Sequence, residues 1–192
     1  MKKKYLIALL ILIMFVMLGS CTGLLYVTFP HQRALTEEEH KWLYSEQHIS
    51  VFLYPTSGSS KPVVEYTENR LGDKSLEYEW QTEAVYLSVL AEKKGLFSQA
   101  KEDYAIYNLG VNLGFLSQKK DLQIKDENHL LQWGTQSSLR TLHSADRWLG
   151  FVFLAWQDQH VIMISAIGPY KASKAEVFAD LQQRLQLFAQ VF

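Results

Sequence analysis

The chain has 192 residues, one cysteine, and 19 Lys and Arg against 20 Asp and Glu. This length suits one domain, or one domain with a targeting segment, and is enough to bury a core without disulfides or metals. Three of the basic residues stand at positions 2–4, so the rest of the chain is mildly acidic. That balance is a poor footprint for nucleic acid, whose binding calls for a basic patch.

The first residues have the three-part layout of an export signal. Lysines occupy positions 2–4, and an uncharged run rich in Leu, Ile, Met and Phe follows over residues 5–18. The small residues Gly19 and Ser20 then precede Cys21. A basic start, an apolar middle and small residues at the end are typical of a secretory signal peptide.

The four residues Leu18-Gly19-Ser20-Cys21 resemble the lipobox of bacterial lipoproteins. The resemblance implies that diacylglycerol is attached to the Cys21 sulfur, that the bond between Ser20 and Cys21 is cleaved, and that the new amino terminus is acylated, for example with palmitate. A thiolate is a good nucleophile for this step, and several acyl chains give stable anchoring where one binds weakly. Since the chain has no other cysteine, a disulfide framework is excluded.

An uncleaved membrane helix is the alternative anchor. Residues 5–29 carry no charge, and about 20 apolar residues suffice to span a bilayer. The lysines at positions 2–4 would hold the amino end inside, so both anchors place the domain outside the cytoplasm.

The resulting domain plan has three parts. Residues 1–20 are expected to be a signal peptide, or residues 5–29 a membrane anchor; residues 21–35 form a tether and residues 36–192 a globular extracytoplasmic domain. The expected location is the cell envelope, on the membrane. In a Gram-negative host, a residue other than aspartate after the lipidated cysteine resembles sorting to the outer membrane, with the domain facing the periplasm.

The first elements of the domain are expected to be a helix and strands. Thr36 and Glu39 form a capping-box pattern, which predicts a short helix to about residue 46. Residues 49–54 and 63–67 are strand candidates that could pair as a hairpin. The alternation from residue 76 to residue 80 predicts a half-buried strand with its aromatic side inward.

The middle of the chain favours helices. Thr82 as a cap and Gly95 as a stop predict a helix to about residue 94, and Ser98 is placed to cap a second helix to residue 107. Gly95, Ala100 and Tyr104 sit at matching offsets, so residues 84–107 resemble a single tetratricopeptide repeat. No second copy appears on either side, so an ordinary helical hairpin is expected. Residues 108–116 are read as a strand and residues 119–128 as a solvated loop.

The last third has the clearest pattern. Residues 139–143 are a strand candidate, and the apolar runs 148–156 and 160–167 predict a central antiparallel hairpin. A capping box at Ser173 precedes a helical stripe of apolar residues that ends at Phe192. The prediction is an α+β fold, an antiparallel sheet packed against helices that include an amphipathic C-terminal helix. The alternative is a mainly helical domain with one hairpin.

The sequence contains little evidence for a catalytic or metal-binding motif. None of the histidines has HExxH spacing or lies near a second cysteine, and the sequence holds no GxGxxG and no P-loop. His143, Ser144 and Asp146 supply the residue types of a nucleophilic triad, but neighbours in sequence rarely converge on one atom. We therefore predict no catalytic residue, metal or cofactor.

The function expected from the sequence is that of a membrane-anchored envelope lipoprotein with a non-catalytic binding or accessory domain. Its partner would be an envelope protein or polymer, besides the membrane that holds its N-terminus. Large aromatic rings often line ligand sites or interfaces, and the candidates are Tyr54, Tyr78, Trp80 and Trp148, with the sheet core as the alternative reading. The rival function is a small membrane-tethered hydrolase with an unrecognised site.

Overall fold

The computed structural model describes residues 28–45, 49, 52–53, 61–95, 99–116, 122–145 and 147–191. The strands are β1 (His31–Gln32), β2 (Val63–Glu68), β3 (Lys74–Gln81), β4 (Tyr86–Lys93), β5 (Leu122–Asp126), β6 (Gln136–Ser144), β7 (Arg147–Gln157) and β8 (His160–Ile167). The helices are α2 (Glu37–His40), α4 (Ala100–Leu116) and α5 (Lys174–Val191). None of these helices has the length and apolar character needed to cross a membrane.

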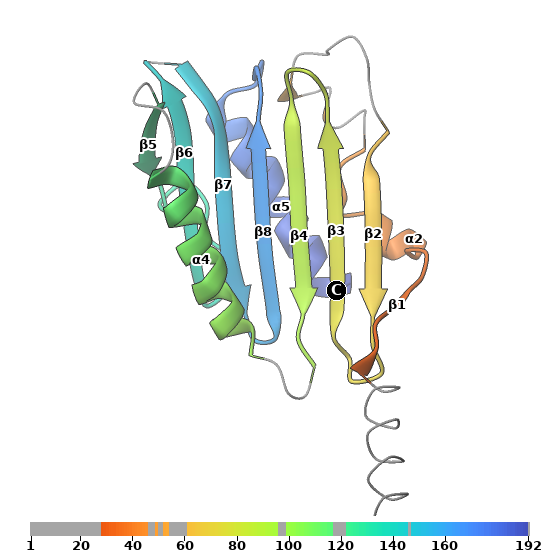
Figure 1. The fold of residues 1–192 in the computed structure, drawn as a ribbon. Helices are drawn as coiled ribbons and strands as arrows, with labels where there is room; N and C mark the ends of the chain where they lie inside the picture. The colour runs from red at the N-terminus through yellow and green to blue at the C-terminus, as the bar shows by residue number, and fades with distance from the viewer. Residues whose placement is uncertain are drawn as a thin grey trace, which may run out of the picture.

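The strands form one open antiparallel sheet in the order β1-β2-β3-β4-β8-β7-β6-β5 (Figure 1). It consists of two meanders, β1 to β4 and β5 to β8, that meet where β4 pairs with β8. Helix α4 lies in front of the sheet in Figure 1 and α5 lies behind it. The predicted α+β class, with an antiparallel sheet against helices, is confirmed.

The main core lies between the sheet and α5. Alternate residues of β3 are buried, and the aromatic ones, Tyr78 and Trp80, are on the side predicted to face inward. From α5, the buried apolar residues are Val177, Phe178, Leu181, Leu185 and Phe188. The predicted capping box is present, because the amide of Glu176 donates to Ser173 Oγ at 3.3 Å and the Ser173 amide donates to the Glu176 carboxylate at 2.8 Å.

Polar contacts fasten the start of the domain to the sheet edge. The Arg33 guanidinium donates to both oxygens of Glu39, at 2.8 and 2.7 Å. Glu39 also completes the predicted capping box with Thr36, although the helix it begins, α2, ends at His40. Arg33 further reaches Glu68 at 3.1 Å and lies 4.2 Å from the ring centroid of Tyr66. The stretch 30–35, the end of the expected tether, thus contains β1 and is held against β2.

The helix predicted from residue 82 to residue 94 is wrong, because this stretch is the end of a turn and strand β4. The Thr82 hydroxyl does accept from a backbone amide, that of Val85 at 3.0 Å, but it closes the β3–β4 turn instead of starting a helix. Side-chain caps stabilise turns and helix starts alike. The alternating burial of Leu87, Val89 and Ala91 shows the strand period.

The strand predicted over residues 108–116 is also wrong, because these residues are the second half of α4. The alternation of apolar residues in this stretch is typical of a strand, but the glycines and asparagines between them are disfavoured in strands. With β4 a strand and α4 a single longer helix, the expected helical hairpin does not exist.

Two smaller expectations are corrected as well. The stretch 119–128, expected to be a loop, contains strand β5, which pairs with β6. Among residues 49–54, the described ones show a helical bond from the Leu53 amide to the Ile49 carbonyl at 2.9 Å, and β2 pairs with β1 and β3 instead. The other strands, and the β7–β8 hairpin at the centre of the sheet, match the predictions.

The Arg33 pair makes a testable contribution to acid stability. The hydrogen bonds from Arg33 lower the pKa of Glu39 from 4.5 to about 2. Because the folded-state pKa is depressed, the charged carboxylate stabilises the fold above pH 4.5, and this stability is lost as the pH falls from 4.5 towards 2. We expect Glu39→Gln to lower the free energy of unfolding near neutral pH by about 1–3 kcal/mol.

The measurement is chemical denaturation of both proteins over this pH range. The wild type should lose more stability than Glu39→Gln between pH 4.5 and 2. Equal acid sensitivity of the two proteins would contradict this role for Glu39.

Candidate binding face

The second face of the sheet is covered unequally. The N-terminal half of α4 packs on β7 and β8, where Ala100 and Tyr104 are buried against Leu154 and Val161. On β2, β3 and β4, the same face carries side chains that are exposed or half-buried. Within the described part of the chain, α4 is the element that lies over this face, and it covers one side of it (Figure 1).

Polar contacts on both sides fix α4 in this position. Lys94, which follows β4, binds Glu92 at 2.9 Å and Asp103 in the first turn of α4 at 2.7 Å. On the other side, Arg140 of β6 donates to Asn108 at 3.2 Å. These contacts hold the helix at its start and middle.

An apolar groove of about 490 Å³ runs between the C-terminal half of α4 and the sheet. Its floor is Tyr86, Leu142, Val152, Met163, Ser165 and Ile167, and its wall is Ile106, Tyr107, Gly110, Val111 and Gly114. A Cβ atom placed on Gly110 or Gly114 would meet no atom within 4 Å. The absence of side chains at these two positions therefore contributes to the open space.

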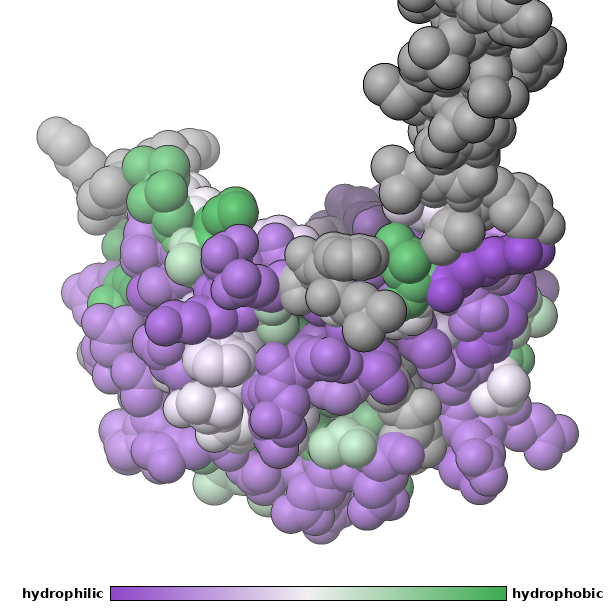
Figure 2. Space-filling model, turned by 90° about the horizontal axis from the view of Figure 1, so that it is seen from below, coloured by the Kyte–Doolittle hydropathy of each residue, from purple (hydrophilic) through white to green (hydrophobic). Residues whose placement is uncertain are grey.

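The outer surface of α4 is also apolar. Ile106, Leu109 and Leu113 are 62, 59 and 58 % exposed, which is unusual for three large apolar residues on one helix. No charged residue occurs from residue 105 to residue 116. Figure 2 shows hydrophobic residues gathered on the part that projects at the upper left, beside a hollow in the surface.

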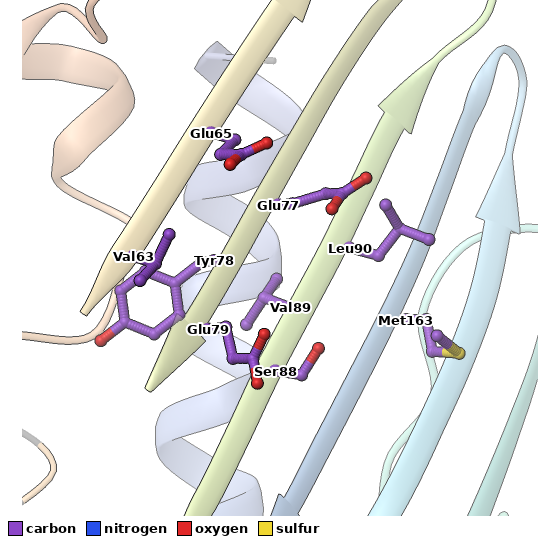
Figure 3. A pocket seen from close by; sticks show the side chains of 9 residues that line it. All are labelled: Val63, Glu65, Glu77, Tyr78, Glu79, Ser88, Val89, Leu90 and Met163. Atoms are coloured by element: carbon purple, nitrogen blue, oxygen red, sulfur yellow. The ribbon is translucent and has the colours of Figure 1, made fainter. Parts of the chain in front are cut away.

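A second, acidic groove of about 310 Å³ lies over β2, β3 and β4 (Figure 3). Glu65, Glu77 and Glu79 line it, together with Val63, Ser88, Leu90 and Met163. All three glutamates are exposed, and none takes part in a salt bridge with another described residue. Glu65 stands directly opposite Glu77 across the β2–β3 pair. Like charges in that arrangement are destabilising.

The two grooves form one continuous face. The strand register places Glu65, Glu77, Leu90 and Met163 in a single row across β2, β3, β4 and β8, which we call the acidic–apolar row. Figure 3 shows these side chains in line on one side of the sheet. Met163 lines both grooves, and its next neighbour in the row, Leu154, is buried beneath α4. The face thus changes from acidic to apolar over a few strands.

Of the aromatic residues singled out from the sequence, Tyr78 borders the acidic groove, but the described ones all pack in or against the core on the α5 side. Tyr78 and Trp80 belong to the core on the α5 side, where the Tyr78 hydroxyl donates to the Tyr44 carbonyl at 2.8 Å. Trp148 stacks on Tyr170 with ring centroids 3.9 Å apart. Tyr54, like the lipidation residues Ser20 and Cys21, lies outside the described residues.

The arrangement closest to a catalytic cluster contains His143. Thr141 Oγ1 donates to Glu127 at 2.7 Å and lies 3.0 Å from His143 Nε2, and Lys174 binds Glu127 at 2.7 Å. Burial lowers the pKa of His143, with a further contribution from Lys174, so the neutral ring is favoured. Because the Thr141 side chain is fully buried, a substrate cannot reach its hydroxyl in this conformation.

The other catalytic and metal expectations concern the same region. Asp146 lies outside the described residues, and Ser144 pairs with Arg147 at the β6–β7 turn. The residues that the structure places contain no group of three or more His, Cys, Asp or Glu able to hold a metal ion.

Comparison with known proteins gives no match to a family model, a curated protein or a solved structure.

Sequence reasoning missed this face for two identifiable reasons. The alternation from residue 76 to residue 80 predicts that Glu77 and Glu79 point outward from a strand. The sequence of one strand does not predict which carboxylates of the neighbouring strands lie beside them. The apolar groove depends on α4, whose second half was read as a strand. The spacing of Gly110 and Gly114 by four residues was the signal available in the sequence, since it puts both glycines on one side of a helix.

The opposed glutamates lead to a stability prediction. We expect Glu77→Gln to raise the free energy of unfolding by about 0.2–1 kcal/mol, because it removes the repulsion with Glu65. Chemical denaturation at low and high salt measures the effect, and the gain should shrink at high salt.

The matched control is Glu83→Gln, at an exposed position in the β3–β4 turn, where no such change is expected. A loss of stability in Glu77→Gln at low salt would show that Glu77 contributes favourably to the fold.

Proposed function

We propose that this chain is a membrane-anchored envelope lipoprotein whose domain has a non-catalytic binding or accessory role. The anchor rests on the sequence pattern that ends at Cys21. The observation that carries the binding role is the half-covered face of the sheet, with its apolar groove and exposed α4 ridge. Contiguous apolar surface beside polar side chains is typical of interaction sites.

The α5 side of the domain is a poor candidate for the same role. We interpret α5 as an amphipathic helix whose apolar stripe, including Phe178, Leu181 and Phe188, is used up in the core. Its outer surface carries polar residues such as Gln183 and Gln186. One large apolar residue of α5, Leu187, is exposed, whereas α4 exposes three beside an apolar groove, so we assign the binding role to the α4 side.

The face supports binding better than catalysis. Catalysis at a site needs groups that exchange protons or attack a substrate, held at a defined separation within reach of it. The titratable groups that line the groove on this face are glutamates, and in the His143 cluster the Thr141 hydroxyl and the His143 ring are buried. An open face with an apolar floor can instead bind a partner by burying apolar surface and by shape complementarity.

The anchor is tested by replacing its sulfur. Cys21→Ser removes the only thiol in the chain, so radiolabelled palmitate should be incorporated into the wild type and not into the variant. Gel autoradiography of both proteins, together with membrane fractionation, measures this. Equal labelling of both proteins, or a wild type without label, would count against lipidation.

The binding face is tested by photo-crosslinking of the full chain in intact envelopes. With p-benzoylphenylalanine at Leu90, we expect a discrete adduct, because Leu90 lies in the acidic–apolar row. The matched control is the same probe at Gln186, on the outer surface of α5. The proposal fails if Leu90 gives no adduct, or if both positions give the same adducts.

A further inference from the structure

We propose that the partner contacts this face with a polypeptide segment that carries lysine or arginine side chains next to large apolar ones. The inference rests on the proposed binding function and adds the chemistry of the occupant. Its basis is the acidic–apolar row, in which acidic side chains begin at Glu65 and apolar side chains end at Met163.

The acidic end sets the charge of the occupant. Glu65, Glu77 and Glu79 form no salt bridge with another described residue, whereas Lys94 and Arg140, two basic residues of this face, are bound to acidic side chains. An approaching cation would gain attraction and relieve the repulsion between Glu65 and Glu77. Anionic lipid headgroups and anionic polymers would be repelled.

The apolar end sets the second requirement. At Met163, which lines both grooves, the row meets the groove beside α4, whose lining carries no charged side chain. Large apolar side chains would displace water from this groove, and burial of such anchors supplies most of the affinity at typical interfaces. A simple cation would satisfy one end of the row and leave the other exposed.

The dimensions suit a short stretch of chain. Neighbouring strands are about 4.8 Å apart, so the row from β2 to β8 spans about 14 Å. Same-side residues of an extended segment are about 7 Å apart, so three of them cover this distance and a fourth extends into the groove beside α4. A segment with alternate residues basic and then apolar would place both kinds of side chain over their matching ends.

The test uses the full chain anchored in phosphatidylcholine nanodiscs, with its methionine methyl groups labelled for NMR. Met163 is the only methionine after residue 17, so its methyl signal reports directly on the row. The probe is the peptide acetyl-Lys-Ser-Lys-Ser-Leu-Ser-Leu-amide. The matched peptides replace both lysines by glutamate, or both leucines by serine.

We expect the cationic apolar peptide to shift the Met163 signal in a saturable way, with both matched peptides binding more weakly. The double variant Glu65→Gln with Glu77→Gln should raise its Kd about five- to tenfold, since two charge contacts are lost. Glu83→Gln should leave the Kd unchanged. Because the double variant removes a repulsion, weaker binding cannot be ascribed to a less stable fold.

Three results would overturn the inference: equal binding of the glutamate peptide, an unchanged Kd in the double variant, or no shift with any peptide. Phosphatidylglycerol nanodiscs form a further arm, and a Met163 shift caused by that lipid would favour a membrane surface as the occupant. If the peptides fail while the probe at Leu90 still gives its adduct, the binding function stands and this choice of partner chemistry is wrong.

Discussion

The two faces of the sheet are buried to different extents, and the open binding face results from this difference. An antiparallel sheet can have one face in the core and the other in contact with water, provided that the second face is polar. Here the α5 side forms the core, and α4 covers the second face only over β7 and β8. The part of the second face beside α4 is neither buried nor uniformly polar. Its row of side chains passes from Glu65 to Met163.

The features of the open face destabilise the isolated fold, which suggests that this face has a function. Folding alone would favour separating Glu65 from Glu77, placing larger residues at Gly110 and Gly114, and keeping apolar side chains off the outside of α4. The chain does none of these. Residues that weaken the isolated fold while shaping one open surface are typical of functional sites. The polar contacts of Lys94 and Arg140 hold α4 where it forms the wall of that surface.

The elements predicted correctly from the sequence are those whose local signals agree with their surroundings. The alternation in β3, the β7–β8 hairpin and the capping boxes at Thr36 and Ser173 are of this kind. Errors arose where one local signal serves two structures, as when Thr82 closed a turn instead of capping a helix. The binding face was not predictable, because it is made by pairing between strands that are distant in sequence, and register is a property of the whole sheet.

The central claim is that this face is open in the isolated protein and occupied in the envelope. Met163 lies at the meeting point of the two grooves and is the only methionine after residue 17, so its oxidation reports on the face directly. Hydroxyl-radical footprinting of purified protein and of intact envelopes, read by mass spectrometry, measures Met163 sulfoxide in both states. The account predicts ready oxidation in the purified protein and protection in the envelope. Equal oxidation in both would contradict it.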